Sequence, residues 1–383
     1  MENEHLNEMQ KSVMGFSSWE LLPYHIWENI LSCLPILTLV RMKIVCKTWR
    51  SIINSQSFLA VYKKANHQDI YFVLFADFIH RNIAAAYNPM EDKWFAISLS
   101  HISSSSPSTS CKIRRTLVSD GSLVLAEDSK GSFFVSNLFT RTFQRLPPML
   151  PLIWSYTIAL VELDFSYKIV AVSVTDKVYS QVYDSITKTW EAKGEFDGRF
   201  AMLGNATHLD GFLYCLSYSP DNLLEFDLNC GTWSVVNVMM PSVVCSHILV
   251  HRGVLILVGG IEEFGVIKRI GIWELDRVER QWRPVCFMPD HLFYKFRLFS
   301  HGNLNQFFTV DRGGKLCFCK STLPHINILM YDLSEKRWWW LPPCPLGSSL
   351  CKQSWFGHAV EPRMDIVQEE ICDSCDKMSR KVG

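Results

Sequence analysis

Hydrophobic and polar positions follow one pattern six times between residues 87 and 338. In each copy an apolar run ends in a polar, turn-forming residue, and one large aromatic residue follows shortly after. These aromatic positions are separated by 49, 47, 43, 49 and 56 residues, and they are Trp94, Phe143, Trp190, Trp233, Trp282 and Trp338. A period of roughly 50 residues fits one four-stranded propeller blade per repeat. The pattern predicts a six-bladed all-β propeller, in which these aromatic rings fill the space between neighbouring sheets.

Glycine-containing dipeptides predict where the strands of several blades turn. They are Asp120-Gly121, Asp210-Gly211, Arg252-Gly253 and Gly313-Gly314, and each is followed by a short β-rich run. Glycine favours such tight hairpins because a positive φ costs it little. Blades one and three lack this signal, and Ile70–Phe75 and Lys168–Val174 are expected to be their inner strands.

A closed ring needs its two ends to be joined, because open sheet edges promote aggregation. The segment Trp355–Val360 follows the last repeat and has a strand-like sequence. We expect it to complete the first blade by pairing beside Ile70–Phe75.

Long connections predict the face of the ring that binds a partner, because binding residues concentrate in loops on rigid scaffolds. In a four-stranded meander, the turns between strands two and three and the connections between blades share one face. The long segments assigned there are Ala96–Lys112, Pro147–Trp154, Gly260–Lys268, Pro284–Phe299 and Cys319–His325. The candidate target-binding residues on them are Trp154, Tyr156, His291, Phe293, Tyr294 and Arg297. The alternative is that these loops only cap the mouth of the ring.

The spacing of apolar residues becomes helical between Ser17 and about Lys64. Pro23 fits a first helical position, Pro35 interrupts the pattern, and Thr38 is a plausible N-cap of the next helix. Three short helices with a shared apolar face satisfy this spacing. The stretch from residue 41 to 64 has no acidic residue and six basic ones, which are Arg41, Lys43, Lys47, Arg50, Lys63 and Lys64. This charge is typical of a solvated helix face, or of a surface that meets an acidic partner.

Composition narrows the class of protein. The chain is 48% hydrophobic and 20% charged, as in a folded protein, and its formal net charge of zero gives no chain-wide attraction to nucleic acid or anionic membranes. The N-terminus lacks the features of a signal peptide, and no apolar run approaches the ~20 residues that span a bilayer. Thirteen scattered cysteines indicate free thiols in a reducing compartment, so we expect a cytoplasmic or nuclear protein.

Sequence signals of catalysis and metal binding are weak. The chain has no phosphate-binding glycine loop, nucleophile elbow or HExxH pair, so we expect no cofactor and no metal. Cys317 and Cys319 are interpreted as alternate strand residues, one pointing inward and one outward. Cys372 and Cys375 have the spacing of a zinc knuckle but stand alone, whereas a full site needs four ligands.

The N-terminal helical region resembles the F-box. The resemblance is carried by Leu22-Pro23, by the stretch from Ile30 to Pro35, by Leu39-Val40-Arg41 and by the stretch from Val45 to Arg50. Together with the degenerate repeats, it is similar to the plant F-box/kelch-repeat group. The expected organisation is a disordered tail (1–16), an F-box (17–64), a kelch-type propeller that binds a target (65–362) and a flexible tail (363–383).

This resemblance implies a function as well as a fold. An F-box docks on the SKP-type adaptor of a cullin ubiquitin ligase, and the C-terminal domain selects the protein to be ubiquitinated. The positions that would form or support the adaptor contact are Leu22, Pro23, Ile26, Ile30, Leu31, Leu34, Pro35, Leu39, Val45 and Trp49. The chain is then a non-catalytic substrate-recognition subunit. The alternatives are a propeller scaffold unrelated to ubiquitination and a propeller enzyme.

Overall fold

The computed structural model describes residues 22–64, 70–76, 83–99, 113–149, 156–163, 166–298, 306–319, 327–344 and 355–363. The N-terminal tail, nearly all of the C-terminal tail, Trp154, Cys372 and Cys375 therefore lie outside the described residues. The chain divides into two compact units, residues 1–68 and 69–383. None of the helices in the described ranges is long and apolar enough to cross a membrane.

The first unit contains four short described helices, where the sequence predicted three. They are α2 (Tyr24–Ser32), α3 (Ile36–Met42), α4 (Lys47–Ile53) and α5 (Gln56–Lys64). Thr38 was predicted to cap a helix, but it lies inside α3. The reason is that the Pro35 carbonyl accepts hydrogen bonds from the Thr38 and Leu39 N–H groups and so starts the helix earlier. The buried apolar side chains of this unit are Leu31, Ile36, Leu39, Ile52, Ile53, Phe58 and Tyr62.

Polar side chains fix the turns between these helices. Cys46 precedes α4, and its Sγ accepts a hydrogen bond of 3.4 Å from the Trp49 N–H. Ser55 precedes α5, and its Oγ accepts one of 3.1 Å from the Phe58 N–H. The carboxylate of Glu28, buried on α2, accepts hydrogen bonds from the hydroxyls of Ser55 and Ser57. The first two contacts cap the N-termini of α4 and α5, and the last two satisfy a carboxylate that the fold takes out of water.

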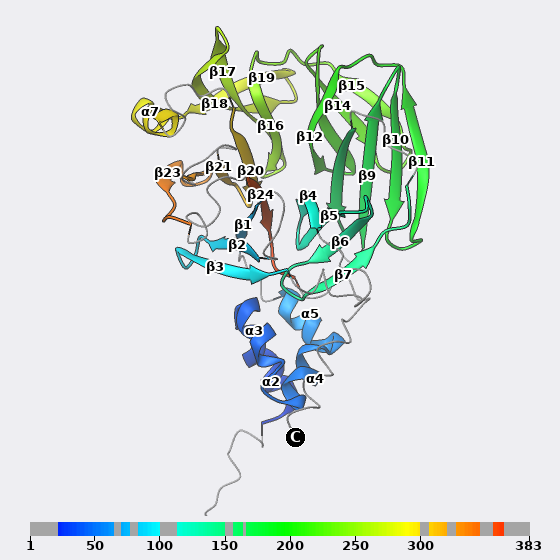
Figure 1. Cartoon of the computed structure of the whole chain (residues 1–383), viewed down its shortest axis with the longest axis vertical. Coiled ribbons are helices and arrows are strands. Elements are labelled where there is room, and N and C mark those ends of the chain that lie inside the picture. Colours follow the sequence, from blue (N-terminus) through cyan, green and yellow to red (C-terminus); the bar gives the residue numbers. More distant parts are fainter. Residues whose placement is uncertain are drawn as a thin grey trace, which may run out of the picture. The chain divides into compact units, whose positions relative to one another are not determined.

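The second unit is a six-bladed propeller of four-stranded antiparallel sheets, as predicted (Figure 1). From the innermost strand outward, blade 1 is β24 (Trp355–Val360), β1 (Tyr71–Ala76), β2 (Ile83–Asn88) and β3 (Lys93–Ser98). Blade 2 is β4 (Ile113–Asp120), β5 (Leu123–Asp128), β6 (Phe133–Asn137) and β7 (Thr142–Arg145). Blade 3 is β8 (Tyr156–Glu162), β9 (Tyr167–Val174), β10 (Val178–Asp184) and β11 (Thr189–Phe196).

The other three blades follow in chain order. Blade 4 is β12 (Met202–Leu209), β13 (Phe212–Tyr218), β14 (Asn222–Asp227) and β15 (Trp233–Val236). Blade 5 is β16 (Val244–His251), β17 (Val254–Glu263), β18 (Val266–Asp276) and β19 (Gln281–Phe287). Blade 6 is β20 (Phe308–Arg312), β21 (Lys315–Cys319), β22 (Leu329–Asp332) and β23 (Arg337–Trp340). A helix, α7 (Asp290–Leu298), lies in the connection between blades 5 and 6.

The ring closes as predicted from the sequence. Strand β24 pairs with β1 in antiparallel register from Tyr71 opposite Val360 to Ala76 opposite Trp355. Each innermost strand contacts the next one around the ring, including β20 with β24 and β24 with β4. The segments Ile70–Phe75 and Lys168–Val174, predicted as inner strands, correspond to β1 and β9, which lie second from the centre of their blades, whereas β24 and β8 are innermost.

The repeated turn has one geometry in all six blades. Its first residue is an Asn or Asp whose side chain accepts a hydrogen bond from the backbone N–H two residues later, as in Asp227 with Asn229. Four residues after it the backbone φ is positive in every blade. Six residues after it comes the repeated aromatic residue, on the outermost strand and opposite the end of the third.

Three of these aromatic residues form hydrogen bonds to a neighbouring blade. The indole N–H of Trp94 donates to the Pro342 carbonyl (2.8 Å), that of Trp190 to the Pro147 carbonyl (3.0 Å) and that of Trp233 to the Ser180 hydroxyl (3.0 Å). In each case the acceptor belongs to the preceding blade. This is the structural role expected for the repeat.

Apolar side chains between adjacent sheets form the propeller core. Phe72 and Leu74 of blade 1, for example, pack in one cluster with Cys317, Cys319 and Met330 of blade 6. The prediction that Cys317 and Cys319 point in opposite directions is wrong. Residues two apart on a strand share a face, and their Sγ atoms lie 3.3 Å apart in this buried cluster.

Candidate functional site

The helical unit exposes an apolar surface at the connection between α3 and α4. Ile44 and Val45 form this connection, and 80% and 62% of their surfaces are exposed. Tyr24 and Ile30 of α2 are also exposed, by a little less than half. Exposed large apolar side chains that make no contribution to the core indicate a surface that binds another molecule.

The structure divides the predicted adaptor-contact residues into two groups. Leu31 and Leu39 are buried, so they support the helical fold and cannot touch a partner directly. The remaining eight are exposed or half-buried, and they are Leu22, Pro23, Ile26, Ile30, Leu34, Pro35, Val45 and Trp49. The prediction missed Ile44, although an isoleucine followed by a valine in a short connection is itself a signal of a contact surface.

Positive charge accompanies this apolar surface. Arg41, Lys47 and Arg50 are exposed, and no carboxylate of the described residues forms an ion pair with them. Partial burial and the charge of Arg50 lower the pKa of Lys43. The mutual repulsion of these cations disfavours the isolated unit and would be relieved by an acidic partner.

On the propeller, the two faces carry different connections. We call the face with the turns between second and third strands and the connections between blades the 2–3 face. The opposite face carries the turns Asp120-Gly121, Asp210-Gly211, Arg252-Gly253 and Gly313-Gly314 at the ends of the innermost strands, as predicted.

Several segments predicted as loops of the 2–3 face are regular structure. Ala96 to Ser98 end strand β3, and Pro284 to Phe287 end strand β19. The segment from Gly260 to Lys268 is a two-stranded hairpin formed by the ends of β17 and β18. The Asp290–Leu298 segment is helix α7, because Leu292, Phe293 and Phe296 recur at helical spacing and pack against blade 5 and blade 6.

The structure places the candidate target-binding residues as follows. His291 and Tyr294 are exposed on α7, and the guanidinium of half-buried Arg297 lies 5.6 Å from the centre of the Tyr294 ring. Phe293 is buried in the core beneath α7, so the expectation that it is exposed is wrong. Tyr156 begins strand β8, and Arg115 donates a hydrogen bond to its hydroxyl.

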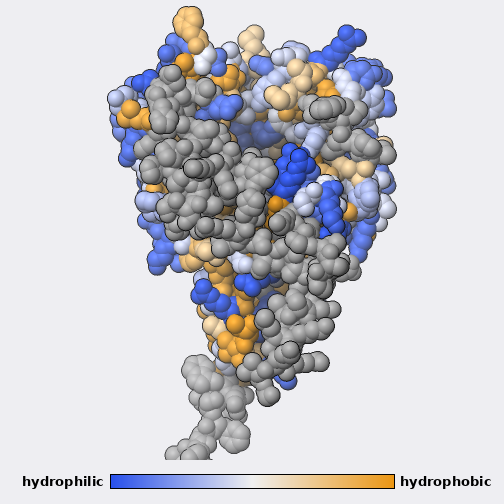
Figure 2. All heavy atoms as spheres, in the orientation of Figure 1, coloured by the Kyte–Doolittle hydropathy of each residue, from blue (hydrophilic) through white to orange (hydrophobic). Residues whose placement is uncertain are grey.

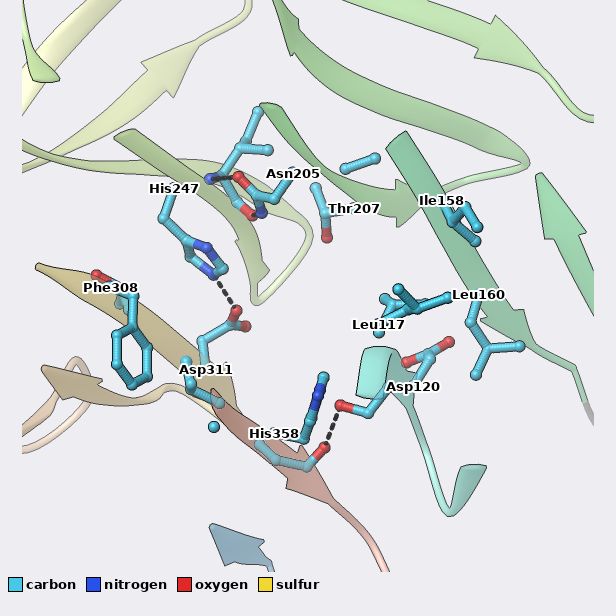
Figure 3. Close-up of a pocket in the computed structure, with 18 of the residues that line it drawn as sticks. Leu117, Asp120, Ile158, Leu160, Asn205, Thr207, His247, Phe308, Asp311 and His358 are labelled. Carbon is cyan, nitrogen blue, oxygen red and sulfur yellow. Dashed lines mark hydrogen bonds and ion pairs between the residues drawn. The ribbon is translucent and has the colours of Figure 1, made fainter. Parts of the chain in front are cut away.

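A cavity of about 1250 Å³ lies within the ring, lined by residues of all six innermost strands. Figure 3 shows His247 of β16 pointing toward Asp311 of β20, and the two side chains are 2.7 Å apart. In the same view Asn205 of β12 lies against β16, where it donates to the Ile248 carbonyl (2.7 Å) and accepts from the Ile248 N–H (2.9 Å). Polar groups of this cavity therefore connect adjacent blades.

An ionic cluster holds the closing strand in place. Arg312 at the end of β20 contacts both Asp120 of β4 (2.5 Å) and Glu361 just after β24 (2.9 Å). Arg363 donates to Glu162 of β8 (2.7 Å), and the Ser122 N–H also donates to Glu162 (2.7 Å). Burial raises the pKa of Glu162 to about 7, although the charge of Arg363 lowers it.

The polar groups of the cavity stabilise the closed ring. The ionic contacts of the cavity join different blades: His247 and Asp311 connect blades 5 and 6, Arg312 and Asp120 connect blades 6 and 2, and the remaining polar side chains described above bind backbone groups. Within the described ranges, no three His, Cys, Asp or Glu side chains gather in a way that could hold a metal ion.

Comparisons with known proteins agree with these two units. Residues 19–60 match the F-box domain family. An F-box/kelch-repeat protein of Arabidopsis thaliana is 26% identical over 85% of this chain and 83% of its own length. A second F-box/kelch-repeat protein of that plant is 26% identical over 93% and 92%. The Arabidopsis thaliana protein UNUSUAL FLORAL ORGANS is 24% identical over 86% and 80%. The resemblance predicted from the sequence is confirmed.

Proposed function

Because the chain carries an F-box domain followed by a kelch-type propeller, we propose that it is a substrate-recognition subunit of an SCF-type ubiquitin ligase. The F-box binds an SKP-type adaptor, which connects the chain to a cullin. The propeller binds the protein to be ubiquitinated. The observation that carries this proposal is the exposed Ile44-Val45 pair beside the exposed cations Arg41, Lys47 and Arg50, which form no ion pair with any described residue.

The physical properties of this surface suit an adaptor contact. Burying one Val or Ile side chain at an interface contributes about 1.5–3 kcal/mol, so Ile44 and Val45 together supply a sizeable part of a specific affinity. The cations increase the rate of encounter with an acidic surface and define the orientation of the partner. Neither Ile44 nor Val45 is needed for the helical core, so both are available to a partner.

The propeller supplies the second binding activity. Its ring is rigid, because the closing strand and the ionic cluster around Arg312 fix its ends. Its 2–3 face bears exposed side chains on α7, among them His291 and Tyr294. In this proposal the chain contributes no catalytic group of its own and requires no cofactor, since ubiquitin transfer belongs to other subunits. We propose that it acts in the cytoplasm or the nucleus.

The alternative function is a propeller scaffold without a link to ubiquitination. In that case Ile44 and Val45 would have no adaptor to bind. A direct binding experiment separates the two functions.

The experiment compares two doubly substituted chains for retention on an immobilised SKP-type adaptor. The first carries Ile44→Asp and Val45→Asp in the F-box. The matched control carries Ile186→Asp and Val278→Asp, which replace similarly exposed residues in turns of blades 3 and 5. We expect the first variant to lose affinity at least about 100-fold and the control to bind like the natural chain. Equal binding of both variants would overturn the proposed contact, and a natural chain that is folded but not retained would favour the scaffold.

A further inference from the structure

Strands β17 and β18 extend beyond the sheet of blade 5 as a two-stranded hairpin. Pairing of β16 with β17 ends at Gly260, and pairing of β18 with β19 begins at Gly271. Between these points β17 and β18 pair only with each other, up to Glu263 opposite Val266. In Figure 1 the hairpin ends at the top of the view, on the side of blade 5 away from the turns of the innermost strands. Phe264 and Gly265 form its tip.

The tip has an unusual residue for its backbone conformation. Phe264 and Gly265 have φ values of 53° and 75°, as in a two-residue type I′ turn. In the described part of the propeller, three other turns have this pair of positive φ values, at Asp210-Gly211, Arg252-Gly253 and Gly313-Gly314. Their first residues are polar or glycine, which is the normal choice. A bulky phenylalanine in this conformation is strained.

No contact with a residue that the structure describes compensates for this strain. Phe264 is fully exposed, with a relative accessibility of 101%. Its ring therefore contributes nothing to the packing of the propeller, and it places a large apolar group in water. A strained residue that the fold does not need points to a role outside the fold.

The charges beside the ring are of one sign. Glu262 and Glu263 are exposed on the strand that leads into the tip, and neither has an ion-pair partner among the residues that the structure describes. The first cations after the turn are Lys268 and Arg269, and the Arg269 guanidinium lies 4.3 Å from the centre of the Phe287 ring at the base of the hairpin. The tip thus presents an aromatic ring with two free carboxylates.

We propose that this hairpin tip anchors the target protein, with Phe264 inserted into an apolar pocket whose rim carries lysine or arginine. This inference rests on the proposed function, because it treats the propeller as the target-binding unit. An aromatic side chain held on a rigid turn loses little conformational freedom on binding, which is a property of interface anchors. The carboxylates of Glu262 and Glu263 pair with the basic rim and exclude partners that lack one.

Helix α7 extends the same surface of blade 5. It contacts β18, and it exposes Tyr294 and Leu298 on the 2–3 face. The hairpin tip and α7 therefore offer two apolar elements from one blade, with the tip as the protruding one.

The test uses photocrosslinking of the full chain in a soluble extract of the cells that express it. Phe264 is replaced by p-benzoylphenylalanine, and the matched control carries this analogue at Val278, which is almost as exposed (89%) in a turn on the opposite face. A third chain combines the analogue at position 264 with Glu262→Lys and Glu263→Lys. Mass spectrometry then locates the crosslinked residue in each adduct.

We expect the adduct from position 264 to be at least tenfold more abundant than the adduct from position 278. Its yield should decrease at least tenfold when Glu262 and Glu263 are replaced by lysine. Its crosslinked residue should be apolar and flanked in the partner by lysine or arginine. Adducts that are equal at the two positions, that survive charge reversal, or that contain only a second copy of this chain would overturn the proposal.

A stability measurement excludes a structural role. Phe264→Asn relieves the strained turn, so we expect the thermal midpoint to rise by about 1–2 °C. We also expect the variant to lose the ability to compete with the crosslinking chain for its partner. A fall in the midpoint would show that Phe264 supports the fold and would contradict the proposal. Adaptor retention of the same variant is measured in parallel, because it reports on the proposed function independently of the hairpin.

Discussion

Val73 in the first strand of the propeller lies directly opposite His358 in the last strand, so the two ends of the ring form one antiparallel pair. The ring of His358 also lies against that of Phe75, with centroids 5.6 Å apart. The Glu361 N–H then donates to the Gly121 carbonyl of blade 2 (2.7 Å). The last strand therefore joins blade 1 to its neighbour on either side.

Removal of the closing strand tests this relationship. Deleting residues 354–362 should leave β1 with an open edge and remove Glu361 from the cluster around Arg312. We expect the variant to aggregate or to melt at least 10 °C lower than the natural chain in a thermal unfolding scan. A soluble variant with an unchanged melting curve would show that the pairing does not hold the ring together.

The pH dependence of stability should report on Glu162. Its folded pKa is raised to about 7 by burial, whereas the ordinary value is 4.5. Between these pH values the folded chain holds a proton on Glu162 that the unfolded chain has released. The contribution of Glu162 to the free energy of unfolding is therefore fully present below about pH 4.5 and is lost as the pH rises through 7.

The matched variant for this effect is Glu162→Gln, which cannot ionise. We expect the free energy of unfolding of the natural chain, minus that of the variant, to decrease by about 2–3 kcal/mol between pH 4.5 and pH 8.5. Chemical denaturation at a series of pH values measures it. A difference that stays constant over this range would mean that Glu162 is ionised throughout in the folded chain.

The repeated turn allows one backbone position to be compared across blades. Gly231 in blade 4 and Arg280 in blade 5 both lie four residues after the turn aspartate, with φ values of 72° and 53°. Gly231→Ala should destabilise the chain by about 1–2 kcal/mol, because it strains the turn and brings a Cβ to 3.1 Å from that of Lys193. Arg280→Gly should be neutral or stabilising by up to about 1 kcal/mol. Urea midpoints measure both, and losses of equal size would refute the common turn geometry.

The cations of the F-box should affect the rate of adaptor binding more than its final strength. Replacing Arg41, Lys47 and Arg50 with glutamine should slow association with an SKP-type adaptor about tenfold at low salt. The difference from the natural chain should shrink at 0.5 M salt, where these charges are screened. Stopped-flow measurements at several salt concentrations test this. A rate that is independent of salt in the natural chain would contradict an acidic partner surface.

Much of the fold follows from local patterns in the sequence. The Asn or Asp that begins the repeated turn and the aromatic residue six positions later mark the last hairpin of each blade. They are recognisable in the sequence because the geometry of the turn and the packing of the ring depend mainly on these two residues. The closing strand was predictable because a ring needs one more strand than the repeats supply. Helix α7 differs from the predicted long loop, although Leu292, Phe293 and Phe296 have helical spacing, because their burial against two blades is a tertiary effect.

The candidate sites were harder to predict, because exposure depends on tertiary packing. Leu31 and Val45 both match the F-box motif, yet one is buried and the other exposed. Phe264 lies in the segment Gly260–Lys268, which the sequence predicts only as a long connection. Only the pairing of β17 with β18 shows that the residue occupies the tip of a rigid hairpin.

Assembly with a cullin is the decisive test of the proposed ligase function. The purified chain, an SKP-type adaptor and a cullin are mixed and separated by size-exclusion chromatography, with and without the adaptor. We expect the chain to elute with the cullin only when the adaptor is present, and Ile44→Asp with Val45→Asp to abolish this co-elution. A folded natural chain that elutes alone while adaptor and cullin elute together would contradict its assignment to a ubiquitin ligase.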